Sequence, residues 1–155
     1  MKIHIVALGH RMPAWVAAGF DDYARRLPRE FALELAEMKA EPRDRGATVE
    51  QILAAEARCI ASRTKGLHLV ALDEHGERWT TARLADRLRH WRDQAIDVAF
   101  VIGSADGLAA SVKRDADAVV SLSALTLPHG LVRVLLAEQI YRAASLLKGH
   151  PYHRE

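Results

Sequence analysis

The sequence predicts an α/β fold with a mostly parallel sheet that is covered by helices on both faces. Short apolar runs of strand length alternate along the chain with longer segments that repeat apolar residues at helical spacing. This alternation is typical of parallel sheets, because each crossover helix must lie on a face of the sheet. No repeat or linker divides the 155 residues. We therefore expect one domain, 1–155, large enough to bury a core without a disulfide or a metal.

Five segments are expected to be strands, and they are 3–8, 31–38, 67–72, 97–102 and 118–122. They are rich in Val, Ile, Leu and Ala and are bounded by glycine, proline or aspartate. Asp73 closes the third strand, and a turn is expected over 74–77. Gly103 to Gly107 forms a loop after the fourth strand, and glycines there let a ligand approach the main chain closely.

Helices are expected between the strands, at 13–27, 48–65, 108–113 and 131–147, and a further one starts at Thr80 or Thr81 and contains Leu84, Leu88 and Trp91. Pro13 suits a first helical position, and apolar residues recur after it at roughly helical spacing, namely Trp15, Ala18, Phe20, Tyr23 and Leu27. Thr48 with Gln51 has the spacing of a capping box. The single cysteine, Cys59, excludes an internal disulfide and is expected to be buried filler in the second helix.

Composition places few limits on function. The net charge is only +2, which permits a nucleic-acid partner without requiring one. No apolar run approaches the roughly 20 residues of a membrane span, and the start of the chain does not resemble a signal peptide. The expected location is the cytoplasm, without a membrane partner.

Residues 121–130 have an unusual composition for a surface loop, because leucines alternate with small residues before a Pro-His-Gly break. Pro128 and Gly130 interrupt any strand there, and a long apolar helix follows at once. Such a segment can turn backbone groups toward a ligand while its leucines anchor it in the core. Ligands of parallel sheets lie beyond the carboxyl ends of the strands. We therefore expect the ends at Leu72, at Gly103 and at 122–127 to converge on one pocket.

Other candidate sites are weaker. Ser123, His129 and Asp106 lack the nucleophile-elbow motif of a hydrolase triad. A metal site of His150 and His153 is disfavoured by Pro151 between them, and no metal is expected.

The last helix carries an open choice at Glu138 and Arg142. They form either a solvated pair or a site in which Glu138 faces the pocket. This helix is apolar nearly all round, which favours burial on several sides, including against another subunit.

Two features suit RNA. The tail 150–155 combines His, Tyr and Arg side chains, which stack on unpaired bases and pair with phosphate. Arginines also cluster on two helices and modestly favour phosphate binding: Arg25, Arg26, Arg29, Arg83, Arg87, Arg89 and Arg92.

Three stretches together resemble one known family over the whole chain. They are Ser-Leu-Ser-Ala-Leu-Thr-Leu-Pro-His before Leu-Val-Arg-Val, the Ile102-Gly103 loop, and the closing His-Pro-Tyr-His-Arg-Glu. The sequence resembles the RlmH family of ribosomal large-subunit methyltransferases, which are of the SPOUT class. Ser104 departs from the glycine usual at the second loop position, and it should be tolerated only if its φ is negative.

The resemblance implies a SPOUT-type α/β fold with a C-terminal trefoil knot, a homodimer, and S-adenosyl-L-methionine as the cofactor. It implies methylation of N3 of a pseudouridine in 23S rRNA within the assembled ribosome. The cofactor-binding positions that it implies are Leu72, Gly103, Leu122, Ser123, Ala124, Leu125, Thr126 and Leu127.

Methylation of N3 requires loss of its proton, and the candidate bases His129, Glu138 and His153 are not ranked by the sequence. Arg142 and Arg154 are candidates for stabilising the oxyanion or holding a phosphate, and Tyr152 completes the candidate catalytic set. We expect the tail of one subunit to complete the pocket of the other. Two alternatives stay open, a non-catalytic RNA-binding protein and a SPOUT methyltransferase acting on tRNA; the absence of an added RNA-binding domain disfavours the second.

Overall fold

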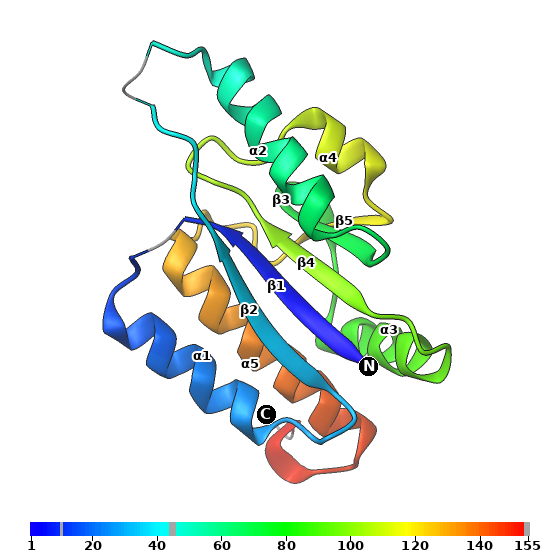
Figure 1. The fold of residues 1–155 in the computed structure, drawn as a ribbon. Helices are drawn as coiled ribbons and strands as arrows, with labels where there is room; N and C mark the ends of the chain where they lie inside the picture. Colours follow the sequence, from blue (N-terminus) through cyan, green and yellow to red (C-terminus); the bar gives the residue numbers. More distant parts are fainter. Residues whose placement is uncertain (10, 44–45, 154–155) are drawn as a thin grey trace.

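The computed structural model describes residues 1–9, 11–43 and 46–153, and it confirms an α/β fold with one parallel sheet (Figure 1). The strand order is β2-β1-β4-β3-β5, and every pairing is parallel. The strands are β1 (Lys2–Leu8), β2 (Ala32–Met38), β3 (His68–Arg78), β4 (Val98–Ile102) and β5 (Ala118–Ser121). The helices are α1 (Ala14–Arg26), α2 (Val49–Arg63), α3 (Thr81–Asp93), α4 (Ala110–Asp115), α5 (His129–Leu147) and the short 3₁₀ helix η1 (Pro151–His153).

Helices cover both faces of the sheet, because successive side chains of each strand point to opposite sides. Ile3 and Ile5 of β1 join a core cluster with residues of α1, α3 and α5. Val6 and Leu8 join a second cluster with residues of α2 and α4. In Figure 1, α1 and α5 lie along one face while α2 and α4 lie over the other. No helix in the described part of the chain is long and apolar enough to cross a membrane.

The predicted turn at 74–77 is wrong, because β3 continues to Arg78. Leu72 and Glu77 are both opposite Val120 of β5, so the residues between them bulge out before the strand resumes its pairing. Gly76 makes this possible. A Cβ atom at Gly76 would lie 2.6 Å from the backbone N and C of Val120. The glycine therefore marks a close approach of two backbones and not a chain reversal.

Several smaller expectations are also corrected. Cys59 is exposed, because α2 buries Ile52, Glu56 and Ile60 on a stripe that misses it. Trp15 is 54% exposed, and Ala18 is exposed as well, because α1 turns Val16 inward together with Phe20, which was expected on the apolar face. The short helix α4 begins two residues later than expected, and β5 ends one residue earlier. Helix α5 begins at His129, directly after Pro128, which places His129 in the first turn.

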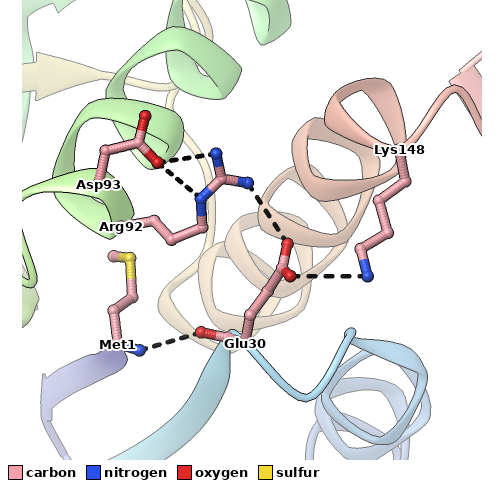
Figure 2. Close-up of polar contacts among 5 residues, drawn as sticks. All are labelled: Met1, Glu30, Arg92, Asp93 and Lys148. Carbon is pink, nitrogen blue, oxygen red and sulfur yellow. Dashed lines mark hydrogen bonds and ion pairs between the residues drawn. The ribbon is translucent and has the colours of Figure 1, made fainter.

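The carboxyl end of α5 is fastened to the start of the chain. Figure 2 shows the Glu30 carboxylate between Arg92 at the end of α3 and Lys148 after α5. Its oxygens lie 3.5 Å from Arg92 Nη1 and 3.7 Å from Lys148 Nζ. The Met1 ammonium donates to the Glu30 carbonyl at 3.0 Å. Each exposed pair contributes little alone, but together they hold the end of α5 from which the tail leaves.

Candidate functional site

A cavity of about 160 Å³ lies between α3, α5 and the carboxyl ends of β3 and β5. Leu72 and Leu122, two of the predicted cofactor residues, line it. Gly103 and the residues 123–127 do not line it. The cavity walls are Leu72, Trp79, Thr80, Thr81, Leu84, Phe100, Val120, Ser121, Leu122, Leu135, Leu136 and Gln139. The predicted convergence of strand ends is therefore correct for β3 and β5.

Polar groups at one side of this cavity were missed by the sequence reasoning. Thr81 Oγ1 donates to Gln139 Oε1 at 2.8 Å, and Gln139 Nε2 donates to Glu138 Oε2 at 2.7 Å. The indole N–H of Trp79 donates to Glu77 at 3.1 Å. Apolar walls with a few convergent polar groups are typical of small-ligand sites. The available signal was Gln139, a polar residue within the apolar last helix, whereas the threonines were interpreted only as helix caps.

The segment 122–127 leaves the sheet edge in a tight local bend. The Ser121 hydroxyl donates to the Ser123 carbonyl at 2.9 Å, and the Leu125 N–H donates to Ser123 Oγ at 2.9 Å. Leu122 packs against the core as expected, but Leu125 is 75% exposed. The prediction that the leucines anchor this segment is therefore wrong for Leu125. Residues 124–126 are exposed to solvent.

The Gly103 loop is fixed by its own glycine and by a buried carboxylate. A Cβ atom at Gly103 would lie 2.6 Å from the Gly107 carbonyl, so a side chain does not fit. Ser104 has no positive φ, which confirms the condition set for a serine there. Its hydroxyl donates to the buried Glu56 at 2.7 Å and accepts from Arg43 at 2.9 Å. The serine thereby connects this loop to the loop after β2.

His129 lies in the first turn of α5, beside the buried side chain of Arg133. Arg133 Nη2 lies 3.1 Å from His129 Nε2 and donates to the Gly9 carbonyl at 2.8 Å. Burial and then the Arg133 charge lower the pKa of His129 below 6.5, against a hydrogen bond with the Gly103 backbone and the charge of Glu37. His129 is therefore neutral near pH 7. Arg133 was not predicted as a site residue, although a lone arginine inside the apolar run 131–136 was a usable signal.

Glu138 and Arg142 bind the tail and do not enter the cavity. Arg142 Nε donates to Glu138 Oε1 at 2.8 Å, and the Tyr152 hydroxyl donates to the same oxygen at 3.3 Å. The Glu138 side chain is only 14% exposed, so the pair is not a solvated surface pair. Burial, a hydrogen bond with Tyr23 and the charge of Glu138 raise the pKa of Tyr152. The phenol therefore remains protonated at physiological pH.

The predicted catalytic residues thus form two groups along α5. His129 lies at its first turn, whereas Glu138, Arg142 and Tyr152 meet farther along the helix. His129 and Arg142 are about 20 Å apart along the helix axis, because 13 residues separate them. The His153 side chain and Arg154 lie outside the described residues. Within the described ranges, no group of three or more His, Cys, Asp or Glu side chains is placed to hold a metal ion.

Comparison with known proteins gives a consistent result. A family model described as "Predicted SPOUT methyltransferase" matches residues 1–153. Proteins named "Ribosomal RNA large subunit methyltransferase H" from Nitrosospira multiformis and Burkholderia mallei are 57% and 54% identical over 155 residues, which cover 99% of each chain. These matches confirm the resemblance based on the loop and tail motifs.

Solved structures agree on the fold. A Bacillus anthracis structure has a TM-score of 0.55 at 16% identity and covers 92% of this chain and 94% of its own. A tRNA (m1G37) methyltransferase from Aquifex aeolicus has a TM-score of 0.53 at 11% identity, over 92% of this chain and 69% of its own. At these identities only the fold is compared. By its family match and its full-length relatives, the chain belongs to the SPOUT methyltransferase family.

Proposed function

We propose that this protein transfers a methyl group from S-adenosyl-L-methionine to N3 of a pseudouridine in 23S rRNA of the assembled ribosome. The observation that carries the proposal is the full-length identity of 54–57% to proteins named ribosomal RNA large subunit methyltransferases. The cavity between Leu72 and Leu122 supports it, because it lies where ligands of parallel sheets bind. A ribosomal substrate would place the protein in the cytoplasm.

The residues around the cavity fit the adenosyl part of this cofactor. Leu72, Phe100 and Leu122 offer apolar walls to an adenine ring, while the backbone groups of the exposed residues 124–126 would supply hydrogen bonds. When bound, the cofactor supplies an electrophilic methyl group on a sulfonium ion. The protein's part in the transfer is to hold donor and nucleophile in line, which is a positioning task.

A trefoil knot would keep this segment rigid, so that little ordering entropy is lost on binding. The knot itself stays a prediction.

The contacts of the candidate bases narrow the choice of the group that would remove the proton from N3. His129 is neutral, but its Nε2 faces the Arg133 guanidinium, which holds that nitrogen as an acceptor. The Glu138 carboxylate already accepts hydrogen bonds from Gln139, Arg142 and Tyr152, so its oxygens are engaged within the chain. His153 is the remaining candidate, so its variant is the first to test. Arg142, with Arg154, would stabilise the oxyanion that develops on the ring or hold a phosphate.

In a homodimer, the tail of one protomer would complete the cavity of the other. Within one chain, Gln139 faces the cavity while Glu138 and Arg142 hold Tyr152 on another face of α5. Trp15 and Leu125 are large apolar side chains that solvent reaches, at 54% and 75% exposure. Exposed apolar residues beside a partly exposed helix favour a subunit contact, which would cover them.

Two measurements test the function. Calorimetry with S-adenosyl-L-methionine should show one binding event that Leu122→Trp, which fills the cavity, abolishes. Mass spectrometry of 23S rRNA from a deletion strain should show loss of one methyl group on a pseudouridine, restored by the wild-type gene. Binding without loss of any 23S rRNA methyl group would point to another RNA substrate. A protein without affinity for the cofactor would be a non-catalytic RNA-binding protein.

A further inference from the structure

Arg133 carries a deeply buried charge that the proposed transfer does not use. Its side chain is 1% exposed, while that of its ion-pair partner Glu37 is 44% exposed. Its Nη1 donates to Glu37 at 2.9 Å, and its Nη2 donates to the Gly9 carbonyl at 2.8 Å and faces His129 Nε2 at 3.1 Å. One guanidinium thus contacts β2, the end of β1 and the first turn of α5.

Stability alone does not account for an arginine at this position. Burying a guanidinium costs free energy that one half-exposed carboxylate returns only in part, and an apolar side chain of similar length would avoid this cost. Arg133 Nε also has no hydrogen-bond partner among the residues that the structure describes. A buried donor without a partner in the protein adds a desolvation cost to that of the charge.

The contacts of Arg133 reach the predicted cofactor loops through His129. Because Arg133 donates to one ring nitrogen of the neutral His129, that nitrogen is an acceptor. His129 also forms a hydrogen bond with the backbone of Gly103. The first turn of α5, where the segment 122–128 ends, is thereby tied to the loop after β4.

We propose that Arg133 is a positioning residue that acts through His129 to fix the segment 122–128 and the Gly103 loop relative to each other. The proposal rests on the proposed function for the claim that these loops hold the methyl donor. Catalytic positioning depends on rigid supports around the site. Misplacement of such loops by a change away from the reacting atoms costs on the order of a hundredfold in kcat/KM.

The titration of His129 reports this contact directly. The groups that face the ring are the Arg133 guanidinium of α5, the Glu37 carboxylate of β2, and the backbone of Gly9 and Gly103. Arg133→Met removes the positive charge, so the ring should protonate at higher pH. Arg133→Lys keeps a charge there but loses the planar fork that spans Glu37 and Gly9.

The test compares Arg133→Met, Arg133→Lys and the control Arg114→Met, which removes an exposed arginine of α4. Ring NMR signals of His129, amide hydrogen exchange of 122–128, thermal midpoints and methyl-transfer kinetics are measured on each full-length protein. We expect Arg133→Met to raise the pKa of His129, accelerate exchange in 122–128 and lower kcat/KM about a hundredfold without lowering the midpoint. Arg133→Lys should leave the pKa low but still accelerate exchange.

A folded Arg133→Met with wild-type exchange in 122–128 and wild-type kcat/KM would overturn the proposal. If Arg133→Met does not fold, Glu37→Gln replaces it, with Glu34→Gln of the same strand as its control. Glu37→Gln should lower the pKa of His129 and accelerate exchange in 122–128; no change in either would also overturn the proposal. If the wild-type protein does not bind the methyl donor, the proposed function fails, while exchange and titration still decide the role of Arg133.

Discussion

Tyr152 donates its phenolic hydrogen to Glu138 Oε1 at 3.3 Å and so fixes the start of the tail on α5. Its ring also packs edge-on against Tyr141 at 4.7 Å between centroids and lies 4.9 Å from the Arg142 guanidinium. Tyr152 itself is therefore held at a defined place on α5. A catalytic role for the tail depends on this attachment, because a frayed terminus would hold no fixed geometry.

Removing the Tyr152 hydroxyl should separate the attachment of the tail from cofactor binding. Tyr152→Phe keeps the ring contacts and loses the bond to Glu138, which contributes about 1 kcal/mol to holding the tail. We expect rRNA methylation to fall roughly fivefold, since about 1.4 kcal/mol corresponds to a factor of ten. Calorimetric affinity for S-adenosyl-L-methionine should not change. Tyr141→Phe is the matched control; a weaker cofactor affinity in Tyr152→Phe would contradict the separation.

The ion pair of Asp73 and Lys113 should give a pH-dependent stability. Burial alone would raise the pKa of Asp73, but hydrogen bonds from the His75 backbone and Lys113 lower it below 3.8. A carboxyl with a lowered folded pKa stabilises the protein above its unfolded pKa and loses that contribution as pH falls through the folded value. Lys113→Met should therefore destabilise by about 1 kcal/mol near pH 7.

The measurement is denaturant unfolding of Lys113→Met and wild type at neutral and acidic pH. The difference between them should shrink as pH falls below 3.8. Lys65→Met, on an exposed residue, serves as the control and should show no such trend. If Lys113→Met lowered the unfolding free energy equally at both pH values, the loss would come from packing and not from the ion pair with Asp73.

His129 should make the protein less stable in mild acid. Its folded pKa lies below the ordinary 6.5, because burial and the Arg133 charge disfavour the imidazolium. Between these two pKa values His129 is protonated in the unfolded chain but not in the folded one. The free energy of unfolding therefore falls as pH drops from 6.5 toward the folded pKa. Thermal midpoints between about pH 5 and pH 8 measure this. His129→Gln should flatten the slope, and the exposed His90→Gln should not.

Gly76 should tolerate no side chain. The Cβ of Gly76→Ala would lie 2.6 Å from backbone atoms of Val120, which cannot move aside as a side chain can. We expect a loss of roughly 1–3 kcal/mol by the usual cost of overpacking. Gly19→Ala is the control, since its Cβ meets only the Val134 side chain at 3.1 Å. Equal unfolding free energies for the two variants would refute the close approach of the backbones.

The sequence predicted the alternation of strands and helices because periodicity records which face of an element is buried. It could not predict that β3 resumes pairing after a bulge, since Gly76 reads equally well as a turn or as a backbone contact. The exposure of Leu125 and Trp15 could not be predicted from the sequence either, because the sequence shows that a residue is apolar but not whether a neighbour covers it. Arg133 was missed because its role depends on Gly9 and Glu37, which lie 124 and 96 residues away in the chain.

Complementation between two defective protomers tests whether the tail acts in trans. One protomer lacks residues 150–155, and the other carries Leu122→Trp, which fills the cavity. In a mixed dimer, the intact cavity of the first protomer can meet the intact tail of the second. If the tail acts across the dimer, the mixed dimer has one competent site, whereas each homodimer has none.

Co-expression with two affinity tags isolates the mixed dimer, and methyl transfer to ribosomes lacking the modification measures its activity. We expect about half of the wild-type rate per dimer, because one of two sites is complete. If the tail acts within its own chain, the first protomer has a cavity without a tail and the second a tail without a cavity. An inactive mixed dimer that still binds one cofactor per dimer would therefore place the tail in cis. Such a result would contradict the argument for action in trans, which rests on Tyr152 and Gln139 lying on different faces of α5.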